Sequence, residues 1–368
     1  MALVNVLCDV KVWIFLGIAL ALVFGFESED ASTILVLVLI AQMSVSLDGV
    51  SFRRDDFRTN ARPILLGILA CFGVNACLTL LTGLFFIADE QLWAGWVMLA
   101  AVPCAVSTVV STLVLRGDVK LSVLTLTAIY VVAILFTPLL TKAILGSAVD
   151  PLEIMKYIVL FVAVPFALSF LVKRLHLKPT VKSVFINVLM LLMVFIGLGS
   201  RRDYLFSDAQ AVAWIVLACL LRTFAVGFVM IWVMRRLNVG RSRGIVYLVM
   251  AVWKNSGMGV SLSMALFAST MPDAVLPCAI SLVIEAVWFA VMSKLLDRAW
   301  PEDGGGPAPA GAARRPSFIS PRAIAWAGGD SQAAQDAGLE NRWSFSSGVR
   351  IPLSAPFLQP CQSGSIDS

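Results

Sequence analysis

The sequence predicts an all-α polytopic membrane protein, and three observations carry that prediction. Hydrophobic residues make up 59% of the 368 positions and charged residues only 14%, and the mean hydropathy is +0.90. Apolar runs of about 20 residues, the length that a helix needs to cross a bilayer, recur along residues 10–298 with short polar breaks between them. A fold that faces water on all sides is excluded, because nearly every long segment is too apolar.

Ten of these runs predict ten transmembrane helices. Only Lys11 precedes the first run, and no small-residue cleavage site follows it before Glu27, so we interpret it as a retained helix and not as a signal peptide. The predicted spans are residues 10–26, 32–50, 63–88, 92–115, 119–144, 152–175, 181–199, 211–236, 243–268 and 275–297.

The distribution of basic residues predicts the orientation, because short loops rich in Lys and Arg stay in the cytoplasm. The loops after the second, fourth, sixth and eighth spans are basic, as at Arg53-Arg54 and Arg235-Arg236. The alternate loops are mostly acidic, as at Glu27 and Asp89-Glu90. We therefore expect a multi-pass protein of the plasma (inner) membrane with both termini cytoplasmic.

After Pro301 the composition changes to Gly, Ala, Pro and Ser, and the hydrophobic periodicity ends. Such a segment cannot bury a core, so residues 301–368 are predicted to form a disordered cytoplasmic tail. A regulatory segment and a dispensable extension both fit this composition.

The ten helices divide into residues 1–150 and 151–300, with five helices in each half. An odd number of helices per half gives the halves opposite orientations, which is the inverted 5+5 repeat of many carriers. The fourth and ninth helices are both disturbed near mid-span, by Pro103 in one and by the run Trp253-Lys254-Asn255-Ser256-Gly257 in the other. We expect broken helices 4 and 9 to cross at the midplane, with an ordinary packed proline kink as the alternative.

Polar groups accompany both disturbances. Hydroxyl side chains follow Pro103 at Ser107, Thr108, Ser111 and Thr112. Backbone groups that a break leaves unpaired in hydrocarbon need a ligand, an ion or water, and helix N-termini that meet there favour an anion.

Lys254 lies near the middle of the ninth helix, where a lysine costs about 2.5–3.5 kcal/mol. It could carry a proton, pair with an anionic substrate or fill an ion site, whereas a structural ion pair with Glu285 is the alternative. Arg222 in the eighth helix is open to a structural or a substrate-binding role.

The segment Pro103 to Ser122 and the segment Met43 to Phe57 resemble the bile acid:sodium symporter family, and the resemblance extends over about residues 10–298. It implies a ten-helix fold in which two broken helices cross at the sodium site. The family's sodium ligands are a Ser-Asn pair after the proline, hydroxyls of the fifth helix, and a Glu and a Gln-Asn pair of the ninth. By spacing these fall on Thr108 and Val109, on Ser122 and Leu126 beside Thr125, and on Met250, Lys254 and Asn255.

Several of those oxygen ligands are therefore missing here, and sodium is a hard cation that requires oxygen. We infer that Lys254 supplies the positive charge that sodium supplies in relatives, so that transport is independent of sodium or coupled to protons. Ordinary sodium-coupled symport is the first alternative. A second resemblance, to arsenite efflux carriers, depends on Pro103-Cys104, although the ninth-helix Glu of those carriers falls on Gly257.

The resulting prediction is a secondary active transporter of a small organic anion that rocks one helix bundle against another. The predicted substrate and ion site comprises Ser107, Thr108, Ser111, Ser122, Lys254, Asn255 and Ser256, with Cys104, Thr125, Arg222 and Glu285 as further candidates. No enzyme is expected, because the single His176 and the scattered cysteines suggest no catalytic cluster, no metal site and no cofactor. The expected partners are the anion and the lipid bilayer, without nucleic acid, and a channel is the competing class of function.

Overall fold

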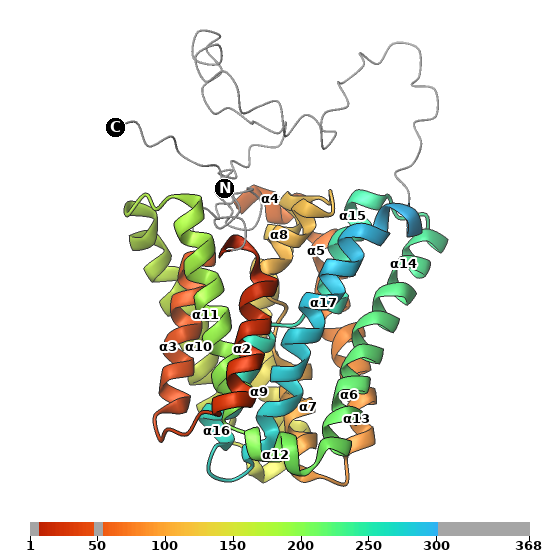
Figure 1. Ribbon diagram of the computed structural model, residues 1–368. Helices are drawn as coiled ribbons and strands as arrows, with labels where there is room; N and C mark the ends of the chain where they lie inside the picture. Colours follow the sequence, from red (N-terminus) through yellow and green to blue (C-terminus); the bar gives the residue numbers. More distant parts are fainter. Residues whose placement is uncertain (1–6, 48–53, 301–368) are drawn as a thin grey trace, which may run out of the picture.

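The structure is a computed structural model, and it describes residues 7–47 and 54–300. Within these two stretches every regular element is a helix (Figure 1). The prediction of an all-helical protein is therefore confirmed. The predicted tail, residues 301–368, lies outside the described residues.

The helices follow one another with short connections. In chain order they are α2 (Val10–Phe24), α3 (Ala31–Ser46), α4 (Arg54–Thr59), α5 (Ala61–Ile68), the π-helix η1 (Leu69–Asn75), α6 (Ala76–Gly83), the 3-10 helix η2 (Leu84–Phe86), α7 (Glu90–Ala101), α8 (Ser107–Val114), α9 (Val119–Leu145), the 3-10 helix η3 (Gly146–Ala148), α10 (Pro151–Arg174), α11 (Pro179–Gly199), α12 (Arg202–Ser207), α13 (Ala209–Leu220), the π-helix η4 (Leu221–Ala225), α14 (Val226–Arg236), α15 (Arg241–Val252), α16 (Ser256–Phe267), the 3-10 helix η5 (Pro272–Ala274) and α17 (Val275–Ala299).

Aspartate side chains begin several of these helices. Asp89, Asp118 and Asp150 each accept a hydrogen bond from a backbone N–H of the first turn of α7, α9 and α10. This contact satisfies a donor that the helix itself leaves free. It explains why these helices start at the polar boundaries that the sequence shows.

Seven helices of the described part are long and apolar enough to cross a membrane. They are Ala61–Phe86, Val119–Leu145, Pro151–Arg174, Thr180–Gly199, Ala209–Arg236, Arg241–Phe267 and Pro272–Ala299. The helices Val10–Phe24 and Ala31–Ser46 are apolar but shorter, and the predicted span 92–115 falls on the successive helices α7 and α8. These lengths and compositions are those of a multi-pass membrane protein.

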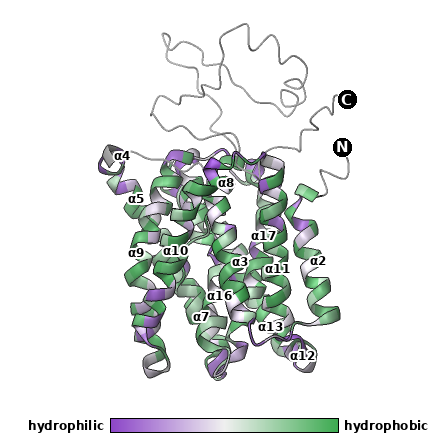
Figure 2. Cartoon of the chain, turned by 90° about the vertical axis from the view of Figure 1, so that its left-hand side faces the viewer, coloured by the Kyte–Doolittle hydropathy of each residue, from purple (hydrophilic) through white to green (hydrophobic). Residues whose placement is uncertain are grey.

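Hydrophobic residues predominate along the helices, as the colouring by hydropathy shows (Figure 2). Large hydrophobic side chains point outward, among them Phe15, Phe85, Val131 and Trp232, each at least 59% exposed. Apolar patches of this extent are unusual on proteins surrounded by water. Lipid chains are their natural solvent.

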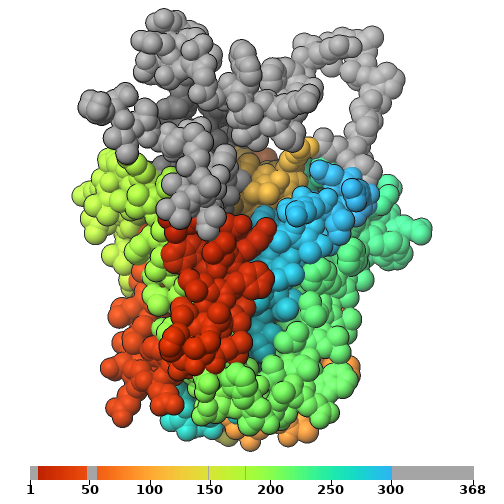
Figure 3. All heavy atoms as spheres, viewed as in Figure 1, coloured from red at the N-terminus to blue at the C-terminus, as the bar shows by residue number. Residues whose placement is uncertain are grey.

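The helices form two groups. The four-helix group consists of α2, α3, α10 and α11, in which α2 packs mainly on α11, and α3 on α10 and α11 (Figure 3). The remaining helices form the larger group, in which α7 packs on α6, α9 and α17. The groups meet where α3 contacts α16, α11 contacts α17, and α10 contacts α9. Each group contains helices from both halves of the chain.

Candidate substrate and ion site

Lys254 lies between α15 and α16 and is fully buried. Its ammonium nitrogen Nζ donates to three backbone carbonyl oxygens, those of Ala100 at 2.8 Å, Val102 at 2.9 Å and Cys71 at 3.3 Å. The ring of Phe72 lies beneath it, with Nζ 5.3 Å from the ring centroid. Three carbonyl dipoles and one aromatic face thus surround the positive charge.

The local backbone explains why these carbonyls are free to accept. The helix α7 ends at Ala101, and Pro103, two residues later, has no N–H to continue the helical hydrogen bonding. The last carbonyls of a helix lack partners within it and carry the negative end of the helix dipole. Cys71 belongs to the π-helix η1, whose wider turn changes the hydrogen bonding of the backbone. The lysine ammonium therefore acts as a cap for the C-terminus of α7.

Asn255 holds the segment between α15 and α16 against the segment between α7 and α8. Its backbone N–H donates to the carbonyl of Pro103 at 2.7 Å. Its side-chain nitrogen Nδ2 donates to the hydroxyl of Tyr130 at 2.9 Å, and its oxygen Oδ1 accepts the N–H of Met258 at 3.0 Å, which caps α16. The two interrupted segments are in direct contact.

Glu285 of α17 pairs with Arg222 and not with the ammonium of Lys254. The guanidinium nitrogen of Arg222 lies 2.6 Å from the Glu285 carboxylate, and both side chains are 1% exposed. Glu285 also accepts the hydroxyl of Ser256 at 2.9 Å and the backbone N–H of Lys254 at 3.1 Å. The alternative of a Lys254–Glu285 ion pair is therefore wrong, because the Lys254 ammonium donates to backbone carbonyls and the Glu285 carboxylate pairs with Arg222.

Arg222 connects the two π-helices. It lies on η4, and its guanidinium nitrogen Nη1 donates to the amide oxygen of Asn75 on η1 at 3.2 Å. The nitrogen Nη2, which pairs with Glu285, also donates to the hydroxyl of Ser281 at 2.6 Å. Wide π turns inside α-helices are frequent at functional sites. Here they place polar side chains beside the segment that carries Lys254.

The three charges of this cluster do not cancel. Lys254 and Arg222 carry two positive charges and Glu285 carries one negative charge, which leaves one positive charge in a region almost without exposure. Charge at this depth of a membrane protein is costly unless it is compensated. An anion that entered beside the cluster would supply that compensation.

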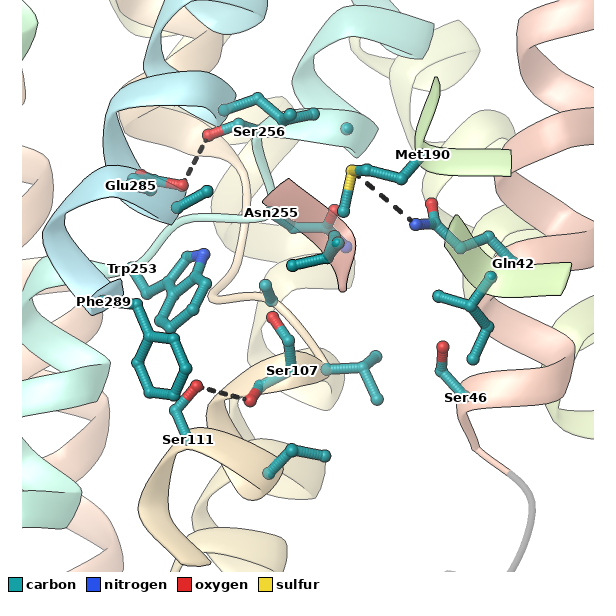
Figure 4. A pocket seen from close by; sticks show the side chains of 18 of the residues that line it. Gln42, Ser46, Ser107, Ser111, Met190, Trp253, Asn255, Ser256, Glu285 and Phe289 are labelled. Carbon is teal, nitrogen blue, oxygen red and sulfur yellow. Dashed lines mark hydrogen bonds between the residues drawn. The ribbon is translucent and has the colours of Figure 1, made fainter. Parts of the chain in front are cut away.

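A cavity of about 280 Å³ reaches the cluster from one end of the bundle. Trp253 and Phe289 line one wall, with ring centroids 5.3 Å apart, and Gln42 and Ser46 lie across from them (Figure 4). Apolar side chains that include Leu39, Met43, Ile186, Met190 and Leu282 complete much of the lining. An apolar chamber with a few polar groups is the usual character of a small-molecule site.

The cavity brings together part of the predicted site. Its lining includes Ser107, Ser111, Lys254, Asn255, Ser256 and Glu285. Ser107 and Ser111 lie on α8 one turn apart, and the Ser111 hydroxyl donates to the carbonyl of Ser107 at 2.9 Å (Figure 4). The first turns of α8 and α16 thus both face the cavity.

The other predicted residues point elsewhere and do not line this cavity. The Thr108 hydroxyl donates to the carbonyl of Ala105 at 2.7 Å, and Ser122 accepts the hydroxyl of Thr112 at 3.0 Å. Thr125 is buried, and its hydroxyl lacks a hydrogen-bond partner. Arg222 does not line the cavity itself but pairs with Glu285, which does. The sulfur of Cys104 lies 3.2 Å from that of Met250, in a fully buried position.

Several residues of the site were not predicted. Gln42 and Trp253 line the cavity, and Asn75 and Ser281 bind Arg222. Polar side chains within otherwise apolar spans were the available signal for Gln42, Asn75 and Ser281. Trp253 adjoins Lys254, but nothing in its apolar surroundings distinguished a cavity wall from packing.

No group of three or more His, Cys, Asp or Glu side chains that could hold a metal ion occurs in residues 7–47 and 54–300. The three oxygen atoms that accept from the Lys254 ammonium are backbone carbonyls. The ammonium of Lys254 already occupies them.

Comparison with known proteins supports the same class. The SBF-like CPA transporter family (DUF4137) matches residues 10–298. The chain belongs to this family. It is also similar to the probable sodium/metabolite cotransporter BASS3, chloroplastic, of Arabidopsis thaliana, with 28% identity over 138 residues. That match covers 36% of this chain and 32% of the plant protein, so it spans about a third of the relative's length. The resemblance to the bile acid:sodium symporter family is confirmed. Membership of a transporter family agrees with the expectation that the chain is not an enzyme.

Proposed function

We propose that this protein is a secondary active transporter of a small organic anion in the plasma membrane, in which Lys254 takes the place of a coupling sodium ion. The observation that carries the proposal is the cradle of three backbone carbonyls around the Lys254 ammonium. Carbonyl oxygen is a ligand that hard cations accept in proteins. An ammonium held there neutralises the same dipoles permanently, so no ion has to bind first.

The residues around the cradle support this proposal. Met250 stands where the resemblance places a carboxylate, and its thioether offers a soft sulfur in place of a charged oxygen. The excess positive charge of Lys254 and Arg222 over Glu285 favours an anion in the neighbouring cavity. Sodium-coupled symport is the alternative, since the plant relative is named as a probable sodium/metabolite cotransporter. The burial of Cys104 away from the cavity gives an arsenite carrier less support.

The fold proposed with this function is a ten-helix inverted repeat with broken fourth and ninth helices crossing at the midplane. In it α7 and α8 form the fourth helix, and α15 and α16 the ninth. The interruptions at residues 102–106 and 253–255 fall at matching places of the two halves. The π-helices η1 and η4 do so as well, in the third and eighth helices.

A ligand screen tests the function. Purified protein is heated with bile acids, keto acids, vitamins or arsenite, in sodium buffer and in choline buffer. A ligand that binds only the folded protein stabilises it by about 2.7 kcal/mol at roughly 100-fold above its Kd. We expect an organic anion to raise the melting temperature equally in both buffers. Stabilisation by an anion only in sodium buffer would support sodium-coupled symport, and stabilisation by arsenite alone would support an arsenite carrier.

The proposed orientation places the basic loops, and both termini, in the cytoplasm. Arg58 of α4 should therefore be cytoplasmic and Glu29 external. A membrane-impermeant maleimide added to intact cells is expected to modify Glu29→Cys and not Arg58→Cys, with the modified peptide identified by mass spectrometry. The reverse pattern would invert the whole orientation.

A further inference from the structure

Part of the cavity lining comes from helix ends that lie at one end of the bundle. Asp9 and Lys11 at the start of α2, Ser46 at the end of α3 and Val114 at the end of α8 all line it. These helix ends lie at the same end of the molecule (Figure 1). The end of α11, the start of α17 and the start of α7 lie at the opposite end, which we call the closed end.

An ion pair joins the two helix groups at the closed end. Arg201 lies in the short connection from α11 of the four-helix group, which ends at Gly199, to α12, and Asp273 lies in η5 directly before α17 of the larger group. Two guanidinium nitrogens of Arg201, Nε and one terminal nitrogen, lie 2.6 Å from the same carboxylate oxygen of Asp273. The backbone N–H of Asp273 donates to the side chain of Gln91 in α7 at 3.1 Å. One arginine thus ties α11 to the loop that positions both α17 and α7.

Two neighbouring contacts at this end also join the groups. Arg202, the first residue of α12, donates to the carbonyl of Leu22 in α2 at 2.8 Å, and the hydroxyl of Ser200 donates to the sulfur of Met264 in α16 at 3.9 Å. The N–H of Phe26, by contrast, donates to the carbonyl of Gly199 at 3.0 Å within the four-helix group. This last contact would survive a movement of one group against the other. The Arg201–Asp273 pair would not, because its partners belong to different groups.

Tyr204, three residues after Arg201, is subject to charges of both signs. Burial and then the carboxylates of Asp89, Asp208 and Asp273 raise the pKa of Tyr204 to about 12, and the guanidinium of Arg201 acts in the opposite direction. Removal of Arg201 would take away the cation that opposes these carboxylates.

We propose that the Arg201–Asp273 pair is a latch that keeps the closed end shut while the cavity is open at the other end. The proposal rests on the proposed transport function, since alternating access is what requires such a latch. The side chains of Arg201 and Asp273 are 28% and 11% exposed. At that degree of burial hydrogen bonds between charged groups are strong enough to shift a two-state equilibrium by about tenfold.

The test measures access to the cavity and not transport. Ser107→Cys places a reporter thiol in the cavity, and a membrane-impermeant maleimide is added at the closed end, with modification followed on the peptide by mass spectrometry. Arg201→Gln and Asp273→Asn are each expected to raise the modification rate about tenfold. Lys156→Gln is the matched control, because it removes a positive charge from an exposed position of α10 without changing the contact between the groups, and it should leave the rate unchanged.

Equal rates in all three variants and the parent would overturn the latch. A second variant, Arg201→Cys with Asp273→Cys, covers the case in which single variants fold poorly. Oxidative cross-linking should lower the Ser107→Cys rate from the closed end, and a reducing agent should restore it. A cross-linked protein that is still modified from the closed end would also contradict the proposal. If the proposed function fails, no anion stabilises the protein, whereas failure of the latch leaves anion binding intact and the modification rates equal.

Discussion

Lys254→Gln is expected to make anion uptake dependent on a small cation. The substitution removes the positive charge from the carbonyls of Ala100, Val102 and Cys71. It also recreates, together with Asn255, the Gln-Asn pair that the resemblance places at these positions. Hydrogen bonds to a charged group are worth about 1.5–3 kcal/mol each, so uptake without sodium should fall by roughly tenfold or more.

The measurement is uptake into proteoliposomes with sodium, potassium or choline outside. The parent protein should transport equally well in all three, and a proton gradient should drive it if Lys254 carries a proton. The variant should lose uptake in potassium and choline and regain part of it in sodium. Lys156→Gln is a matched control, because Lys156 is an exposed lysine on α10 outside the cavity lining. Strong stimulation of the parent by a sodium gradient, saturating with sodium and absent with potassium, would show that Lys254 does not replace the ion.

Arg222→Leu is expected to destabilise the protein by about 3–5 kcal/mol, because it leaves the carboxylate of Glu285 buried without its partner. Glu285→Gln should also destabilise, since it leaves the guanidinium of Arg222 uncompensated. The double variant Arg222→Leu with Glu285→Gln should lose less than the sum of the two, by about 0.5–3 kcal/mol, because neither charge is then left alone. Unfolding of the detergent-solubilised protein measures all three.

The same series separates the two pairings of Glu285. If Glu285 balanced Lys254, Glu285→Gln would partly rescue Lys254→Gln. The structure places the Lys254 ammonium on carbonyls and the Glu285 carboxylate on Arg222, so we expect no rescue. Additive losses for Arg222→Leu and Glu285→Gln would contradict the buried pair.

The candidate site was predictable only in part. Pro103 and the polar run at Trp253 to Gly257 mark where α7 and α15 end, because a missing N–H or a polar side chain acts locally on the helix that contains it. Which hydroxyls face the cavity was not predictable from the same run. Ser107 lines the cavity and Thr108 does not, since consecutive helical residues point about 100° apart and only the neighbouring helices decide which direction is inward.

The sequence by itself determined that this chain is a helical membrane protein of a transporter family, because hydrophobicity, span length and local helix breakers are properties of short segments. Only the tertiary structure decided which groups meet. The Lys254 ammonium donates to the carbonyls of residues 71, 100 and 102, and the Glu285 carboxylate accepts from Arg222, 63 positions earlier in the chain. A buried charge takes the partner that packing brings within hydrogen-bond distance, and that distance depends on how helices remote in sequence are placed against each other.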